Sequence, residues 1–177
     1  MNLTSAKTLY NLAQKEYELE NDRGKVLDTK ANMLLVLCFP PLLFIFNTST
    51  TWNAFINLFS KNKNMISYEY SISLIIVILT CIFIGFILAS IRNILNIIDL
   101  KSYERLSISS MKDDLFRYNT ENDFSLFAAI KYDLAITENR KINDEKAALF
   151  GSACSFLLYD TFIFVLYFIV LKLSGLN

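Results

Sequence analysis

The sequence predicts an all-α integral membrane protein with three transmembrane helices and cytosolic helical extensions. Hydrophobic residues make up 54% of the 177 residues, and only four glycines and two prolines are present. The apolar residues therefore gather in long uninterrupted segments rather than in short strands separated by turns. The mean hydropathy of +0.37 is too high for a soluble domain. Basic and acidic residues balance at 17 each, and no basic stripe indicates a nucleic-acid-binding surface.

Residues 1–30 predict a cytosolic N-terminal helix. Leu9, Leu12 and Leu19 recur on a rough helical face, interleaved with charged residues. The segment has no apolar core of the kind that a cleavable signal peptide needs, so we expect it to be retained.

Residues 31–52 predict the first transmembrane helix. Ala31 to Phe46 is a run of 16 residues without a charge, and the uncharged residues up to Trp52 complete the last turn of a span. A re-entrant hairpin is the alternative. Pro40 and Pro41 lack backbone N–H groups and predict a kink, as a static fit to neighbouring helices or as a hinge.

Two further segments, 70–91 and 147–171, are long enough to cross a membrane. The first is 22 residues without a charge, and the second is 25 residues with the single charge of Asp160. They leave an external loop at 53–69, a cytosolic helical region at 92–146 and an external tail at 172–177. Lys and Arg number five, two, nine and one in the successive segments outside the spans. This alternation predicts a multi-pass protein with a cytoplasmic N-terminus, an external first loop, a cytoplasmic second loop and an external C-terminus.

A charged sequence is repeated before the first and third spans. Lys25-Val26-x-Asp28-x-Lys30-Ala31 recurs 116 residues later as Lys141-Ile142-x-Asp144-x-Lys146-Ala147. No helix breaker separates either copy from its span, so each cytosolic helix is expected to continue into the bilayer. We expect Lys30 and Lys146 to extend their ammonium groups back to the interface, and each aspartate to form a weak pair with the lysine three residues before it.

Two interpretations of the repeat remain open. Each copy is a solvated helix end, or each belongs to a rigid helix that transmits movement from the cytosol into the membrane. In the second case the coupling candidates are Asp28, Lys30, Asp144 and Lys146.

Asp160 lies near the middle of the third span, where a charge costs at least about 2.5–3.5 kcal/mol. It is expected to be protonated, to bond a hydroxyl such as Thr80, or to face water in an oligomeric pore. Small residues at four-residue spacing allow close helix packing, within a chain or between chains. They include Gly85 and Ala89 on the second span and Gly151 and Ser155 on the third.

The residue arrangements that enzymatic catalysis requires are absent from the sequence. It contains no histidine, no glycine-rich phosphate loop and no nucleophile elbow, and its three cysteines fit no zinc pattern. We expect no enzymatic activity, no cofactor and no metal site.

The two repeated sequences support a family resemblance. An N-terminal helix that ends in Asp28-Thr29-Lys30-Ala31 resembles the small transmembrane effectors of bacterial anti-phage signalling, notably the Pycsar type. The second copy, with Asn139, Lys141, Asp144, Lys146 and Ala147, is similar. The resemblance implies an effector in the inner membrane that impairs membrane integrity on an upstream infection signal, which is a cyclic pyrimidine nucleotide in the Pycsar case. This chain shows no nucleotide-binding motif.

The resulting hypothesis is a homo-oligomeric antiviral effector that permeabilises or depolarises the lipid bilayer when a signalling nucleotide or a defence protein activates it. One alternative is a pore-forming or regulatory accessory of an RNA-targeting CRISPR system. The other is a constitutive membrane anchor for a soluble partner.

Overall fold

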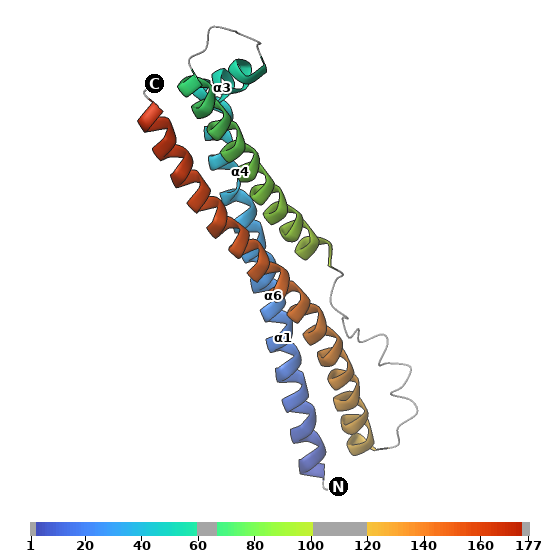
Figure 1. Cartoon of the computed structure of the whole chain (residues 1–177). Helices are drawn as coiled ribbons and strands as arrows, with labels where there is room; N and C mark the ends of the chain where they lie inside the picture. The colour runs from blue at the N-terminus through green and yellow to red at the C-terminus, as the bar shows by residue number, and fades with distance from the viewer. Residues whose placement is uncertain (1–2, 60–66, 101–119, 175–177) are drawn as a thin grey trace. The chain divides into compact units, whose positions relative to one another are not determined.

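A computed structural model describes residues 3–59, 67–100 and 120–174 of the chain (Figure 1). These residues are 97% helical and contain no strand. The helices are α1 (Leu3–Leu37), α2 (Phe39–Asn47), α3 (Ser49–Phe59), α4 (Ser67–Asp99) and α6 (Glu121–Ser174). The all-α prediction is therefore confirmed for the part of the chain that the structure describes.

Three helical stretches are long and apolar enough to cross a membrane. They cover Ser5–Asn47, Tyr68–Asp99 and Glu121–Leu173, and thus contain the predicted second and third spans in full and residues 31–47 of the first. Length and composition together indicate a multi-pass membrane protein.

The chain divides into two compact units. The first unit comprises Met1–Lys30 and Ile98–Ala148, and the second comprises Ala31–Ile97 and Leu149–Asn177. The divisions fall at or next to the two places where the sequence changes from charged to apolar. Helices α1 and α6 are unbroken at these places, so each contributes residues to both units.

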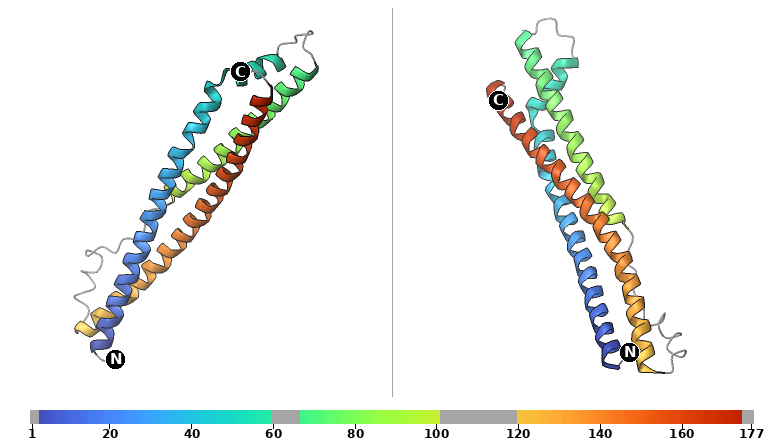
Figure 2. Two further views of the ribbon diagram at one scale, coloured as in Figure 1. Left: turned by 90° about the vertical axis from the view of Figure 1, so that its left-hand side faces the viewer. Right: turned by 60° about the horizontal axis from the view of Figure 1, so that its bottom comes forward.

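In the first unit, α1 and α6 lie side by side and run in the same direction (Figure 2). Their contacts advance together along both helices, from Tyr10 with Tyr132 to Asp28 with Lys146. Each helix presents a stripe of buried or half-buried positions that alternate by three and four residues, as in a parallel coiled coil. The stripe on α1 is Ala6, Tyr10, Ala13, Tyr17, Glu20, Gly24 and Leu27, and that on α6 is Ser125, Ala128, Tyr132, Ala135, Asn139, Ile142 and Lys146.

In the second unit, α4 runs antiparallel to the last part of α6. Phe83 packs near Phe164, Phe86 near Tyr159, and the Ser90 hydroxyl donates to the Ala153 carbonyl. The buried core is apolar and includes Ala31, Cys38, Ile45, Ile76, Phe83, Ile87 and Tyr167. The outward surface is also apolar, because large side chains such as Leu43, Ile78, Leu88, Leu158 and Phe162 are exposed. Such a surface is suited to lipid rather than to water.

The helix of the first span is interrupted at Cys38, where α1 has ended and α2 has not begun. The Cys38 N–H bonds the Leu35 carbonyl at 3.2 Å, which is the tighter spacing of a helix end. Pro40 and Pro41 follow within the first turn of α2, where their missing N–H groups cost least. The interruption therefore lies just before the two prolines.

A second interruption, at Thr48, ends the first span earlier than the expected boundary at residue 52. Thr48 is extended (φ −80°, ψ 114°), and its hydroxyl donates to the Phe44 carbonyl at 2.8 Å. The Trp52 indole N–H donates to the Phe46 carbonyl at 2.8 Å. These bonds satisfy carbonyls at the C-terminal end of α2, so a short separate helix, α3, replaces the expected last turn and the start of the external loop.

Candidate functional site: polar side chains inside the two units

Five polar side chains are buried in the apolar second unit. Thr51, Ser73, Thr80, Ser90 and Asp160 are each at most 4% exposed. Buried polar groups in such surroundings are costly unless they are hydrogen-bonded. Three of the hydroxyls have acceptors or partners within the unit: Thr51 bonds the Tyr167 hydroxyl, Thr80 bonds the Ile76 carbonyl, and Ser90 bonds the Ala153 carbonyl.

Asp160 differs from these hydroxyls because its Oδ1 has no hydrogen-bond partner among the described residues. The residue occupies the buried stripe of α6, which in this unit runs through Leu149, Ala153, Phe156, Asp160, Ile163 and Tyr167. Asp160 is close enough to Cys38 for an electrostatic interaction, and the Cys38 thiol in turn interacts with Ser90. A carboxyl group is thus held inside the bundle beside the interruption between α1 and α2.

Thr80 does not bond Asp160, although the sequence offered it as a partner. Its hydroxyl donates to the Ile76 carbonyl of its own helix at 2.8 Å. A threonine in a helix readily bonds the carbonyl four residues earlier, and this local bond leaves no donor for Asp160.

Gly85, Gly151 and Ser155, three of the four predicted packing residues, are exposed in the described part of the chain. A Cβ atom added at Gly85 or at Gly151 would meet nothing within 4 Å. Ser155 is exposed and bonds the Gly151 carbonyl of its own helix, and Ala89 is half-buried. These positions therefore remain open for contact with another molecule.

Lys146 is the most deeply buried charged side chain of the first unit's described residues. It is 3% exposed, and its ammonium group lies 2.6 Å from Asp28 Oδ1. Asp28 is half-buried at 38% exposure, so this ion pair is screened much less than a surface pair. The aspartate of one repeat thus binds the lysine of the other.

A second charged group lies earlier on the same two helices. Glu20, at 13% side-chain exposure, accepts a 2.7 Å bond from Asn143 Nδ2 and lies 3.5 Å from Arg140 Nε. Asn143 also donates to the Glu20 carbonyl at 2.8 Å. Glu20 therefore connects α1 to α6 through both its backbone and its carboxylate.

Arg23 links Glu20 to the second repeat. Its Nη2 lies 2.7 Å from Asp144 Oδ1, and its Nη1 lies 3.6 Å from Glu20 Oε1. The hydrogen bond that Arg23 donates to Asp144 is the main reason that the pKa of Arg23 is raised above its ordinary value. The charged contacts between α1 and α6 thus run from Glu20 to Lys146.

The contacts differ from two expectations for the repeated sequences, those for Lys25 and Lys146. Lys25 pairs with Asp22 at 2.9 Å rather than with Asp28. Lys146 turns into the helix pair and does not extend to an interface. Lys30 is exposed, so it lacks the setting of its counterpart Lys146. The physical reason is rotational phase, because Ala31 lies on the buried stripe in the first copy whereas Lys146 lies on it in the second.

Sequence reasoning did not single out Glu20, Arg23 or Asn143. A signal was present, because Asn139 and Lys146 share the three-and-four spacing of Ala128, Tyr132 and Ala135. Polar residues on such a stripe commonly specify the register and partner of a coiled coil.

Among the described residues, no group of three His, Cys, Asp or Glu side chains is arranged to hold a metal ion. In comparisons with protein-family models, curated proteins and solved structures, no family model, protein or structure matches this chain.

Proposed function

We propose that the protein is a prokaryotic antiviral membrane effector that oligomerises and permeabilises or depolarises the inner membrane on an upstream infection signal. The observation that carries the proposal is the buried Asp160 carboxyl, whose Oδ1 has no hydrogen-bond partner among the described residues, within an apolar unit. Ionisable groups inside transmembrane bundles are rare, and they usually mark ion pathways or proton relays. The resemblance of the two repeated sequences to the Pycsar-type effectors supplies the antiviral setting.

The continuity of α1 and α6 supports a signal-dependent effector. Each helix carries charged contacts in the first unit and contributes to the core of the second, without a break between them. Because α6 also carries Asp160, a binding event that changes the pairing of α1 with α6 acts on the helix that holds this carboxyl group. The interruption at Cys38, beside Asp160, is the position at which the first span deforms most easily.

The open small residues support assembly of several copies. Gly85 and Gly151 are exposed positions on long apolar helices, and no side chain of the described residues covers them. Close approach of helices at small residues is a common basis of association within membranes.

The test is membrane potential in cells challenged with phage, followed with a potential-sensitive dye. Wild type is expected to depolarise the membrane, and Asp160→Asn, which keeps the shape of the side chain, is expected to depolarise it much less. The matched control is Thr161→Val. Thr161 is the exposed neighbour of Asp160 on α6, and its hydroxyl donates to the Leu157 carbonyl of the same helix. Absence of depolarisation by wild type under every phage challenge contradicts the effector function.

A constitutive anchor for a soluble partner is the second candidate, and one surface favours it. In the first unit, an open apolar groove of about 410 Å³ lies between α1 and α6, lined by Leu9, Leu12, Ile130 and Ile136, with Glu16 and Asp133 at its polar parts. An anchor predicts that one partner copurifies in fixed stoichiometry and that the membrane potential does not change. Leu12→Gln in the groove then abolishes copurification, whereas Asp160→Asn has no effect.

A further inference from the structure

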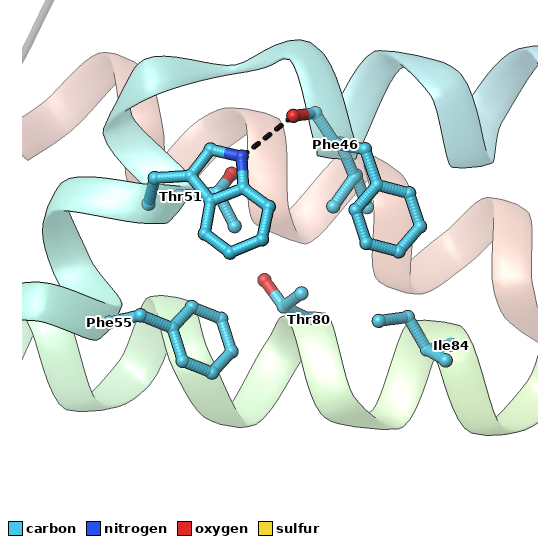
Figure 3. Close-up of a pocket in the computed structure, with 7 residues that line it drawn as sticks. Phe46, Thr51, Phe55, Thr80 and Ile84 are labelled. Carbon is cyan, nitrogen blue, oxygen red and sulfur yellow. Dashed lines mark hydrogen bonds between the residues drawn. The ribbon is translucent and has the colours of Figure 1, made fainter.

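A second pocket lies in the other unit, at the end of the first span. It has a volume of about 230 Å³ and is lined by α2, α3 and α4 through Phe46, Trp52, Phe55, Thr80 and Ile84. Figure 3 shows Phe46, Phe55, Thr80 and Ile84 from the different helices facing the same space. The pocket is distinct from Asp160, which is not among its lining residues.

The pocket offers no free polar group to a ligand. Of the two hydroxyls in its wall, that of Thr80 is bonded to the Ile76 carbonyl and that of Thr51 to Tyr167. The Trp52 indole N–H is bonded to the Phe46 carbonyl. An apolar cavity of about 150 Å³ stays free of water and accepts benzene. The larger cavity here therefore selects an apolar occupant.

The surface around the pocket identifies that occupant. Trp52 is 52% exposed and Phe46 is 48% exposed, so the pocket opens to the outside between them. Trp52, Ile56 and Phe59 recur on one face of α3 and are all exposed, with Phe59 at 80%. A helix with such a face lies at a membrane boundary, and tryptophan prefers that level. The medium at the opening is therefore the acyl region of the lipid.

We propose that this pocket binds an acyl chain of a membrane phospholipid, held between α3 and α4 with the Trp52 indole as one wall. The bond to the Phe46 carbonyl fixes the indole, so the wall exists before the chain enters. The inference requires membrane insertion but not the effector function, because an anchor would retain the same lipid site.

The sole tryptophan of the chain reports directly on the pocket. Purified full-length protein is reconstituted into phosphatidylcholine vesicles with brominated acyl chains, which quench indole fluorescence on contact. Thr80→Leu fills the pocket with a larger apolar side chain. Because part of the exposed Trp52 surface faces bulk lipid outside the pocket, we expect its quenching to fall and not to vanish.

Thr161→Leu is the matched control. Thr80 and Thr161 each donate to the carbonyl four residues earlier at 2.8 Å, but Thr161 is exposed and lies outside the pocket. The control is expected to leave quenching at the wild-type level. Equal quenching in wild type and Thr80→Leu overturns the proposal.

A second pair guards against misfolding of Thr80→Leu. Ile84→Phe narrows the pocket, and Ile78→Phe changes an exposed position of the same helix. Reduced quenching only in Ile84→Phe supports the lipid site. Unchanged quenching in both variants overturns it. Crosslinking of Phe55 to a second copy of the chain, rather than to a photoactivatable phospholipid, also overturns it. Failed membrane insertion is distinguished from an absent lipid site by a Leu88→Trp substitution in a Trp52→Phe background. Because Leu88 is exposed, the fluorescence quenching of the new tryptophan measures contact with bulk lipid.

Discussion

The Lys146 ammonium group lies 2.6 Å from Asp28 Oδ1, and this contact joins the two copies of the repeated sequence across α1 and α6. The two residues are not equivalent members of the repeat. Lys146 is enclosed at 3% exposure, whereas Lys30, its counterpart, is exposed. The repeat thus contributes residues to two interhelical ion pairs, Lys146 with Asp28 and Asp144 with Arg23, and its copies are not two similar helix ends.

Removing the Asp28 charge is expected to destabilise the pairing of α1 with α6. Asp28→Asn removes the carboxylate that lies 2.6 Å from the buried Lys146 ammonium, and losing one partner of a buried pair costs about 3–5 kcal/mol. Because Asp28 is 38% exposed, we expect the lower end of that range. The measurement is the unfolding temperature of the purified full chain in detergent.

The Lys25–Asp22 pair supplies the control for this variant. Its side chains are 65% and 69% exposed, and exposed pairs contribute about 0–1 kcal/mol. Asp22→Asn should therefore leave the unfolding temperature nearly unchanged. Equal shifts for Asp22→Asn and Asp28→Asn would show that the Lys146 contact does not stabilise the helix pair.

Glu20 is predicted to stabilise the same helix pair through Asn143. Asn143 is fully buried, and Glu20→Ala removes one of its two acceptors together with the partner of Arg140. Loss of a hydrogen bond to a charged group costs about 1.5–3 kcal/mol. Glu18→Ala is the control, because Glu18 accepts only a bond from Gln14 of its own helix among the contacts described. Chemical denaturation of both variants should separate them, and indistinguishable midpoints would refute the role of Glu20.

The environment of Tyr132 leads us to expect that the first unit loses stability in alkaline solution. Burial, and then Tyr10, raise the pKa of Tyr132 above its ordinary value. The Tyr132 ring packs edge-on against the rings of Tyr10 and Tyr17, at centroid distances of 5.7 and 5.4 Å. A raised folded-state pKa means that the contribution is complete below the unfolded-state pKa, about 10, and is lost as pH rises through the higher folded-state value.

The measurement is unfolding of the full chain as a function of pH, combined with the absorbance of tyrosinate. Tyr132→Phe should remove part of the stability loss above about pH 10. Tyr68→Phe, at an exposed tyrosine, should retain it. A wild-type profile that Tyr132→Phe leaves unaltered would contradict the burial of this ring between the helices.

The long helices could be predicted from the sequence because spans need continuous apolar residues, and these runs are visible without any contact information. The change from charged to apolar at Lys30 and Lys146 likewise anticipated where the two units divide. The end of the first span could not be placed, since it depends on the Trp52 indole reaching the Phe46 carbonyl, a contact between two helices. The hydropathy pattern of the sequence does not reveal that hydrogen bond.

The pairing within the first unit was also beyond prediction from single helices. One residue of displacement rotates a side chain by about 100° around a helix. That rotation places Ala31 on the buried stripe of α1 and Lys146 on that of α6, although the two sequences align by a shift of 116. Only the partner helix decides which of two aligned lysines becomes buried.

The account rests on both copies of the repeated sequence lying on the cytosolic side of one membrane, which site-directed labelling tests most directly. Single cysteines are introduced at exposed Lys25, Lys141 and Asn53 in a chain whose three native cysteines are replaced. A membrane-impermeant thiol reagent added outside spheroplasts should label position 53 alone, and positions 25 and 141 only after lysis. Labelling of positions 25 and 141 from opposite sides of the membrane would contradict the proposed topology and the function built on it.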